Sequence, residues 1–175
     1  MTPSDKQAKG KEHQQEKKVV KRIALIRIKG KPGLKVEIKK TLDLLSLYKK
    51  NHCVVIPATP VYVGMVEKVK NTITWGEIDE KTCKMLLEKR GRLAGKQPLT
   101  AAYLKEKLKC TVEEFVSDFM AGKRELKDIP GLKRFFKLTP PRHGFEKKGI
   151  KVPYSLGGVL GYRKEGINDL IQRMV

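Results

Sequence analysis

The sequence predicts an α+β protein in which a small lobe with the element order β-α-β-α-β precedes a mainly helical part with a long irregular basic segment. Three observations predict this fold class. Over residues 19–78, short apolar runs of strand length alternate with stretches in which apolar residues recur at helical spacing. Residues 79–122 and the C-terminal residues carry helix caps and helical periodicity. Between them, residues 123–162 lose periodicity and hold far more lysine and arginine than acidic residues.

Three strands are predicted in the first lobe. The first, over residues 19–28, has the apolar centre IALI, which suits a central strand that is buried on both faces. The second, over residues 53–56, is stopped by Pro57, and the third, over residues 71–75, ends at Gly76. The pattern gives the order of these elements but not the direction of the strands.

Two helices are predicted between these strands. In the first, leucine and isoleucine recur at helical spacing over residues 34–45. The second begins at Thr59, whose hydroxyl is expected to cap it, with Pro60 at the first helical position. One face of the second helix is expected to carry Val61, Met65 and Val69. The lobe is expected to bury Leu25, Ile26, Leu42, Leu45 and Met65.

The second half is predicted to be mainly helical. One helix covers residues 79–90 and stops at Gly91, and another begins with Thr100 as its cap. Thr111 to Glu114 form a capping box, in which the threonine hydroxyl and the glutamate carboxylate each accept a backbone amide. A last helix closes the chain. The inward faces are expected to hold Cys83, Leu86 and Leu87; Leu104 and Leu108; Val112, Phe115, Val116 and Phe119; and Ile167, Leu170, Ile171 and Met174.

The irregular segment, residues 123–162, is unusually long for a compact domain. We expect it to thread along RNA, with its cations on phosphates and its aromatic rings on bases or in the helical part. Phe135 and Phe136 are interpreted as core anchors that pin the segment to its own domain. Residues 139–144 contain two prolines that stiffen an extended strut, and this strut would present Arg142 to a phosphate or a base.

The charge of the chain indicates a polyanionic partner. Lysine and arginine number 39 against 19 acidic residues, which gives a net charge of +20. Residues 1–90 contribute +11 and residues 91–175 contribute +9, so the excess covers the whole body. A protein that reads DNA would more often concentrate its charge on one helix, and a membrane-surface protein would show one basic amphipathic helix. RNA embedding is therefore the favoured interpretation.

Several other classes of protein are disfavoured. No apolar run approaches the roughly 18 residues that span a bilayer, and the N-terminus lacks the apolar segment of a secretory signal. The three cysteines form no C-x-x-C pair, which favours a reducing, intracellular compartment, and the three histidines show no metal-ligand spacing. Neither a P-loop nor a G-x-G-x-x-G turn between strand and helix is present. We therefore predict no enzyme activity, cofactor, metal site or small-molecule substrate.

The N-terminal residues 1–18 are polar and contain no aromatic residue. In isolation such a segment is predicted to be disordered. It is interpreted either as a solvated tail or as a basic arm that orders on RNA.

Several motifs, taken together, resemble a ribosomal protein family. They are IRIKGKPG at 26–33, TLDLLSL at 41–47, TPVYVGMVEKVKNTITWGEID at 59–79, LLEKRGRL at 86–93, FKLTPPRHGFEKKG at 136–149 and INDLIQRM at 167–174. Their order is similar to that of large-subunit ribosomal protein thirty, in the long form shared by archaea and eukaryotes, where the eukaryotic members are numbered seven. The resemblance covers residues 19–175, and the short N-terminal arm favours the archaeal type.

The resemblance implies a ferredoxin-like lobe, with a three-stranded antiparallel sheet and two helices on one face. It implies a ribosome-bound, cytoplasmic protein that acts in translation, with large-subunit ribosomal RNA, five-S ribosomal RNA and neighbouring large-subunit proteins as partners. By motif position, Arg27, Lys29, Lys31 and Arg142 are implied to face RNA. Basic residues of the strand, turns and irregular segment complete the predicted RNA contacts, which are Arg22, Arg27, Lys29, Lys31, Arg90, Arg92, Lys96, Lys133, Arg134, Lys137, Arg142, His143, Lys147, Lys148 and Arg163.

One other class of function stays open at this point. A free regulator or chaperone that binds RNA or DNA would also be basic. Such a protein needs a single reading surface, whereas an embedded ribosomal protein tolerates charge on many faces.

The three parts that we predict are the arm (1–18), the sheet lobe (19–78) and the helical extension (79–175), which contains the RNA-threading segment 123–162.

Overall fold

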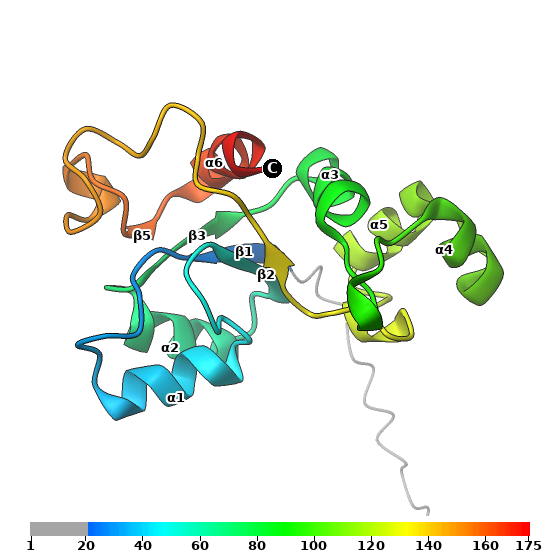
Figure 1. Cartoon of the computed structure of the whole chain (residues 1–175), viewed down its shortest axis with the longest axis horizontal. Coiled ribbons are helices and arrows are strands. Elements are labelled where there is room, and N and C mark those ends of the chain that lie inside the picture. The colour runs from blue at the N-terminus through cyan, green and yellow to red at the C-terminus, as the bar shows by residue number, and fades with distance from the viewer. Residues whose placement is uncertain (1–20) are drawn as a thin grey trace, which may run out of the picture.

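The computed structural model describes residues 21–175, apart from the side chain of Lys96, and it is an α+β protein (Figure 1). The predicted N-terminal arm lies outside the described residues. The strands are β1 (Arg22–Arg27), β2 (His52–Pro57), β3 (Ile73–Glu77), β4 (Phe136–Lys137) and β5 (Gly161–Tyr162). The helices are α1 (Val36–Leu44), α2 (Pro60–Val69), α3 (Glu80–Arg90), α4 (Ala101–Leu108), α5 (Val112–Met120) and α6 (Ile167–Met174).

The strands form one mixed sheet in the order β4-β2-β1-β3-β5. Strand β1 lies in the middle and pairs antiparallel with both β2 and β3. All six of its residues are buried, as predicted for a central strand. The prediction of a three-stranded sheet is wrong in its count, because β4 adds antiparallel to β2 and β5 adds parallel to β3.

The side chains of the sheet alternate between two apolar cores, because successive residues of a strand point to opposite faces. Leu25 packs with Leu42 and Val66 in the core beneath α1 and α2. Ile26 and Phe115 belong to the core on the opposite face, which is filled from α3, α5 and α6. Figure 1 shows α1 and α2 together on one side of the strands and α6 and α3 on the other.

Most predicted helix starts agree with the structure. The Thr111 hydroxyl accepts the Glu114 amide while the Glu114 carboxylate accepts the Thr111 amide, so the capping box is present. Thr100 likewise accepts the amide of Tyr103. Pro60 opens α2 as predicted, but Thr59 makes no capping hydrogen bond, so that part of the prediction is wrong.

The buried face of α2 is rotated relative to its prediction. Val61 is 74% exposed, whereas Val66 and Val69 are buried and Met65 is half-buried. Positions 62, 65, 66 and 69 follow the helical repeat that meets the sheet, and Val61 precedes this stripe by one residue. Three apolar residues at i, i+4 and i+8 do not by themselves fix which side of a helix faces a core.

The predicted irregular segment contains more regular structure than expected. It supplies β4 and β5, together with short 3₁₀ turns at Leu126–Asp128 and Tyr154–Leu156. Around β4, buried Phe136 and Leu138 alternate with exposed Lys137, which is the pattern of an edge strand with one buried face. Phe136 is thus a core residue, as predicted.

Glycine is required at position 76, directly after Trp75. A Cβ atom at this position would lie 2.0 Å from the carbonyl oxygen of Lys164, in the short turn that leads into α6. Only glycine permits so close a backbone approach. Position 76 lies within β3 rather than beyond its end. The Trp-Gly pair therefore allows the C-terminal helix to pack onto the third strand.

Candidate nucleic-acid interface

The predicted RNA contacts divide into an exposed group and a buried group. The half-buried side chains are Lys29, Arg90 and Lys133, and the exposed ones are Lys31, Arg92, Arg134, Lys137, Arg142, His143, Lys147 and Lys148. The side chain of Lys96 lies outside the described residues. Three arginines, Arg22, Arg27 and Arg163, are each less than 5% exposed. The structure therefore contradicts the prediction that these three face RNA.

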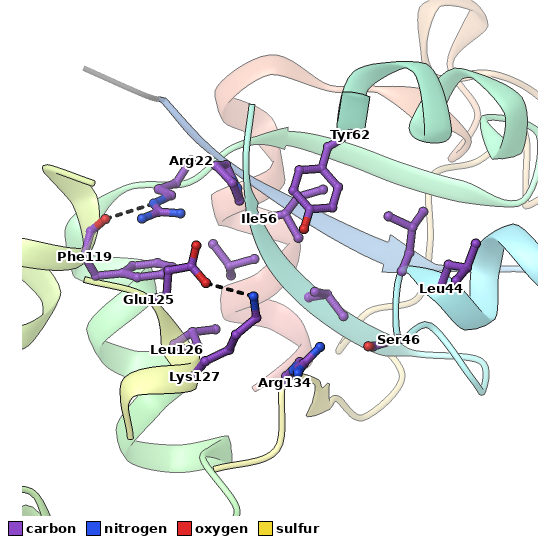
Figure 2. Close-up of a pocket in the computed structure, with 14 residues that line it drawn as sticks. Arg22, Leu44, Ser46, Ile56, Tyr62, Phe119, Glu125, Leu126, Lys127 and Arg134 are labelled. Atoms are coloured by element: carbon purple, nitrogen blue, oxygen red, sulfur yellow. Dashed lines mark hydrogen bonds and ion pairs between the residues drawn. The ribbon is translucent and has the colours of Figure 1, made fainter. Parts of the chain in front are cut away.

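Arg22 connects the start of β1 to the end of α5. Its Nε donates to the carbonyl of Phe119 at 2.9 Å, which Figure 2 shows, and its Nη2 donates to the carbonyl of Arg124 at 3.0 Å. The guanidinium also lies 4.2 Å from the centre of the Phe119 ring. Burial lowers the pKa of Arg22 from its usual value of 12.5. Because these contacts lie within the chain and Arg22 is 4% exposed, little of the side chain is available to a phosphate.

Arg27 holds the loop that follows α1. Its Nη1 donates to the carbonyls of Leu47 and Tyr48 at 2.7 and 3.2 Å, and its Nε donates to the carbonyl of Lys29 at 2.8 Å. Burial lowers its pKa as well. Position 27 belongs to the central strand, which has no solvent face, so the prediction of a buried strand already argued against an exposed arginine here.

Arg163 forms the most extensive of these buried networks. It donates to both carboxylate oxygens of Glu146, at 2.5 and 2.8 Å, and its Nε donates to the Thr74 hydroxyl at 2.9 Å. Burial alone would raise the pKa of Glu146, but the hydrogen bond and charge of Arg163, with a smaller contribution from Arg173, hold it below its usual value. This network fixes the irregular segment to β3.

A cleft of about 610 Å³ opens where β2 and β4 meet, and it gathers cations around aromatic rings. We call it the basic cleft, and it is lined by Tyr48, Lys49, His52, Arg92, Lys133, Phe135 and Lys137. Strand pairing places Lys137 opposite His52, and the Lys133 amide donates to the Arg92 carbonyl at 3.0 Å. The fold therefore assembles the cleft from three separate stretches of chain.

The aromatic rings of the basic cleft stack on one another. The rings of His52 and Phe135 are nearly parallel, with centroids 4.5 Å apart, and Tyr48 meets Phe135 edge to face at 5.6 Å. Burial and the nearby charges of Lys137, Lys49 and Arg27 lower the pKa of His52 to about 4. The imidazole is therefore neutral at pH 7.

Sequence reasoning identified only part of this cleft. It named Arg92, Lys133 and Lys137, but it placed Phe135 in the core and overlooked Tyr48, Lys49 and His52. A signal is present in the run YKKNH over 48–52, where a tyrosine and two lysines lead into the histidine that begins β2. Phe135 is half-buried, so it serves both the core beneath α1 and α2 and the wall of the cleft.

A second cleft, of about 420 Å³, holds cations without an aromatic ring. We call it the lysine cleft, and it is lined by Lys29, Lys70, Asn71, Lys151, Pro153, Leu160 and Gly161. It lies at the β3–β5 edge, whereas the basic cleft lies at the β2–β4 edge. The strand registers place Arg27, Cys53 and Ile73 near one another, so both clefts sit at the same end of the sheet.

The segment that presents Arg142 is docked along the C-terminal helix. The amides of Thr139 and Arg142 donate to the carbonyls of Met174 and Arg173, at 3.0 and 2.9 Å. The amide of Gly144 donates to the carbonyl of Pro141 at 3.0 Å, which closes a turn directly after Arg142. Within residues 21–175, the Arg142 guanidinium has no hydrogen-bond or ion-pair partner.

Arg90, another predicted RNA contact, also makes a contact within the chain. Its Nη2 donates to the carbonyl of Val175 at 2.8 Å and lies 3.5 Å from the Thr139 hydroxyl. The side chain thus holds the C-terminal residue against the docked segment. This contact occupies one side of the guanidinium, and the rest of the side chain is half-buried.

The same residues also bear on metal sites, reactive thiols and membrane spans. Among residues 21–175, no three His, Cys, Asp or Glu side chains come together to hold a metal ion. Cys53, Cys83 and Cys110 are buried free thiols, and burial raises the pKa of Cys53 and Cys83. In the described part of the chain, no helix is long and apolar enough to cross a bilayer.

Comparison with known proteins finds one consistent similarity. The family model described as "Ribosomal protein L30p/L7e" matches residues 23–73, which run from β1 to the start of β3. A relative from Methanopyrus kandleri, named large ribosomal subunit protein uL30, is 46% identical over 149 residues, covering 85% of this chain and all of that protein. Relatives of the same name from Methanococcus vannielii and Nanoarchaeum equitans are 45% and 46% identical over 152 residues, covering 87% of this chain and 98% and 97% of theirs.

Proposed function

The chain belongs to the ribosomal protein L30p/L7e family, and from this membership we propose how it holds ribosomal RNA. It is a structural constituent of the large ribosomal subunit, of the archaeal uL30 type, and it acts in translation on cytoplasmic ribosomes. It is not an enzyme. Its partners are ribosomal RNA and neighbouring ribosomal proteins of the large subunit.

The principal RNA surface in this proposal is the end of the sheet that carries both clefts. One observation carries it: Lys29, Lys70 and Lys151 at one edge, and Lys49, Arg92, Lys133 and Lys137 at the other, converge on the end where β1 finishes. Cations spread over such a surface neutralise successive phosphates. The remaining proposed contacts are Lys31, Arg134, Arg142, His143, Lys147, Lys148 and Lys96.

Finer assignments are part of the same proposal. Five-S ribosomal RNA is proposed as one of the RNA partners, and the support is the family resemblance of the motifs. The sheet lobe (19–78) would supply the family's common RNA-binding unit, which is supported by the match of the family model to 23–73. The extension (79–175) would add the contacts of segment 123–162, with the arm (1–18) as a further basic contact.

The experiment is a salt titration of full-length protein binding to large-subunit ribosomal RNA. If about 6–10 phosphates are neutralised, affinity should fall by about 10³–10⁵ between 50 and 200 mM salt. Replacing Lys29 and Lys137 together by glutamine should reduce the salt slope by about 2. The matched control replaces Lys81 and Lys105, which are exposed on α3 and α4, and should leave the slope near that of the unmodified protein.

Two outcomes would contradict the proposal. Affinity that stays constant between 50 and 200 mM salt would exclude phosphate contacts as the main source of binding. An equal reduction of the slope by both pairs of substitutions would mean that charge acts generally and that the end of the sheet has no special role. Co-sedimentation with five-S RNA alone, compared with the large ribosomal RNA alone, tests the five-S assignment separately.

A further inference from the structure

The basic cleft differs from the rest of the proposed RNA surface in having an aromatic wall. Tyr48 is 41% exposed although it packs edge to face on Phe135, so much of its ring faces open space. The ring of His52 stacks nearly parallel on the ring of Phe135 and supports it. Exposed aromatic rings that are held rigidly in a groove are the usual platforms for unpaired bases in single-stranded nucleic acid.

The floor of the cleft contains a polar ring that the chain leaves without hydrogen bonds. His52 is 4% exposed, and within the described residues neither of its ring nitrogens has a hydrogen-bond partner. Buried polar atoms are nearly always paired, so each exception requires an explanation. Here the imidazole stacks on Phe135 instead, and because both of its nitrogens are buried, a ligand in the cleft meets the rings of Tyr48 and Phe135 rather than those nitrogens.

Four cations surround these rings. Lys49, Arg92 and Lys137 are exposed, and Lys133 is half-buried. Within residues 21–175, none of the four forms a salt bridge with an acidic side chain, although ion pairs occur elsewhere on the surface. The volume of about 610 Å³ lies in the range of pockets that hold small organic groups. The cleft therefore combines an exposed stacking surface with uncompensated positive charge.

We propose that the basic cleft holds a single unpaired nucleobase of the bound RNA, which packs on Tyr48 and Phe135 while the four cations bind its flanking phosphates. The inference rests on the proposed RNA-binding function and adds a ligand class to one site. Base-paired RNA does not meet this requirement, because its bases are already stacked and its major groove is too narrow for side chains to read. The lysine cleft, without aromatic rings, binds phosphates alone.

The test uses full-length protein and two RNA probes, a single-stranded hexaribonucleotide with a central 4-thiouridine and a fully paired, blunt-ended RNA duplex. Tyr48→Leu should weaken binding of the single-stranded probe by roughly 5- to 150-fold, as expected for the loss of one base–aromatic stack. Binding of the duplex should change by less than about twofold. Tyr48→Phe, which keeps the ring, should bind both probes like the unmodified protein.

Tyr162→Leu is the matched control, because Tyr162 is 43% exposed and packs on another aromatic ring, that of Trp75. It should leave single-strand binding unchanged. Irradiation of the thiouridine probe should cross-link Tyr48 or Phe135, as identified by mass spectrometry. The thermal midpoint of each variant identifies any loss of folding, and cross-linking of the unmodified protein preserves the test if Tyr48→Leu fails to fold.

The proposal would be overturned by equal effects of Tyr48→Leu on both probes, or by cross-links that map away from the cleft. A hexaglutamate peptide, which offers negative charge without bases, should displace the single-stranded probe less readily from the unmodified protein than from Tyr48→Leu. Equal displacement from both proteins would also overturn the proposal, because it would show that the cleft binds any anion. In each of these cases the protein still binds ribosomal RNA. Failure to bind ribosomal RNA at all would instead refute the proposed function.

Discussion

The interior of the sheet and the irregular segment beside it both hold arginine, yet they use it differently. Arg27, in the central strand, is 1% exposed and donates three hydrogen bonds to backbone carbonyls. Arg142, in the docked segment, is exposed and has no side-chain partner within the described residues. One residue type therefore serves to join distant parts of the chain in one region and to meet an outside anion in the other.

Because some arginines are buried, the net charge of +20 does not show how many cations are available to RNA. Arg22 and Arg163 each contact residues far away in the chain, at Phe119 and Glu146 respectively. A buried guanidinium costs solvation energy, which is offset only when most of its donors are satisfied. Part of the positive charge thus stabilises the protein itself, and only the exposed part is available to RNA.

Arg163→Met should cause the largest loss in the free energy of unfolding, because Arg163 is buried. It leaves Glu146, whose side chain is 22% exposed, without its bidentate partner, and such losses cost about 3–5 kcal/mol. Chemical denaturation measures the change. Arg142→Met, the exposed control, should change the free energy of unfolding by less than about 0.5 kcal/mol.

A double variant sharpens this test. Arg163→Met combined with Glu146→Leu removes the carboxylate that has lost its bidentate partner and retains only Arg173, and it should recover part of the lost stability. If the single and double variants are equally unstable, the loss comes from packing and from the bonds to Thr74 and Val159. In that case the ion pair has no special role in fixing the segment.

Much of the fold could be predicted because the helical repeat and the capping residues act locally. The C-terminal helix is an example, since Ile167, Leu170, Ile171 and Met174 are all buried as their spacing indicated. Strand β5 could not be predicted, because its two residues, Gly161 and Tyr162, form a strand only by pairing with Thr74 and Trp75. Such short edge strands are set by distant partners and leave no periodic pattern in the sequence.

Leu42→Ala tests the packing of the lobe beneath the sheet against a control on the same helix. Leu42 is fully buried, so its truncation should create a cavity and cost about 2–5 kcal/mol. Leu44 is 76% exposed, and Leu44→Ala should cost less than about 0.5 kcal/mol. Urea denaturation of both variants measures the difference, and a loss below about 0.5 kcal/mol for Leu42→Ala would contradict the core assignment.

The candidate site was less predictable than the fold. Residue type alone identified Lys133 and Lys137, because lysine near aromatic residues indicates a nucleic-acid surface. It could not identify which arginines are buried, since burial depends on the order of strands in the sheet. It also could not bring Tyr48 next to Phe135, because that contact requires the pairing of β2 with β4.

Arg142→Ala should have a smaller effect than the interior substitutions, and the effect should appear in a different measurement. RNA association should weaken by about 1–3 kcal/mol, the range of a charge-assisted hydrogen bond, while the melting temperature of the free protein stays nearly unchanged. Arg142→Lys should recover part of the loss, because a point charge cannot bind two phosphate oxygens as a planar guanidinium does. A ribosome structure in which Arg142 points into open solvent would refute the contact.

The smallest expected effect is a pH dependence of stability that arises from buried His52 and not from exposed His143. Burial and neighbouring cations lower the pKa of His52 from 6.5 to about 4 in the folded protein. Between these two values the unfolded chain binds more protons than the folded chain, so the free energy of unfolding should fall as the pH drops from 6.5 toward 4. Above pH 6.5 both states are neutral at this residue, and its contribution to stability is fully present. Because Lys49 and Lys137, which contribute to the shift, are exposed, water screens part of their effect, and the loss should be on the order of 1 kcal/mol.

His52→Phe removes the titrating group and should flatten this part of the stability profile, whereas His143→Phe, at an exposed position, should leave it in place. The measurement is urea denaturation at several pH values from 4 to 8, and equal slopes for the two variants would show that the imidazole in the basic cleft titrates as it does in the unfolded chain.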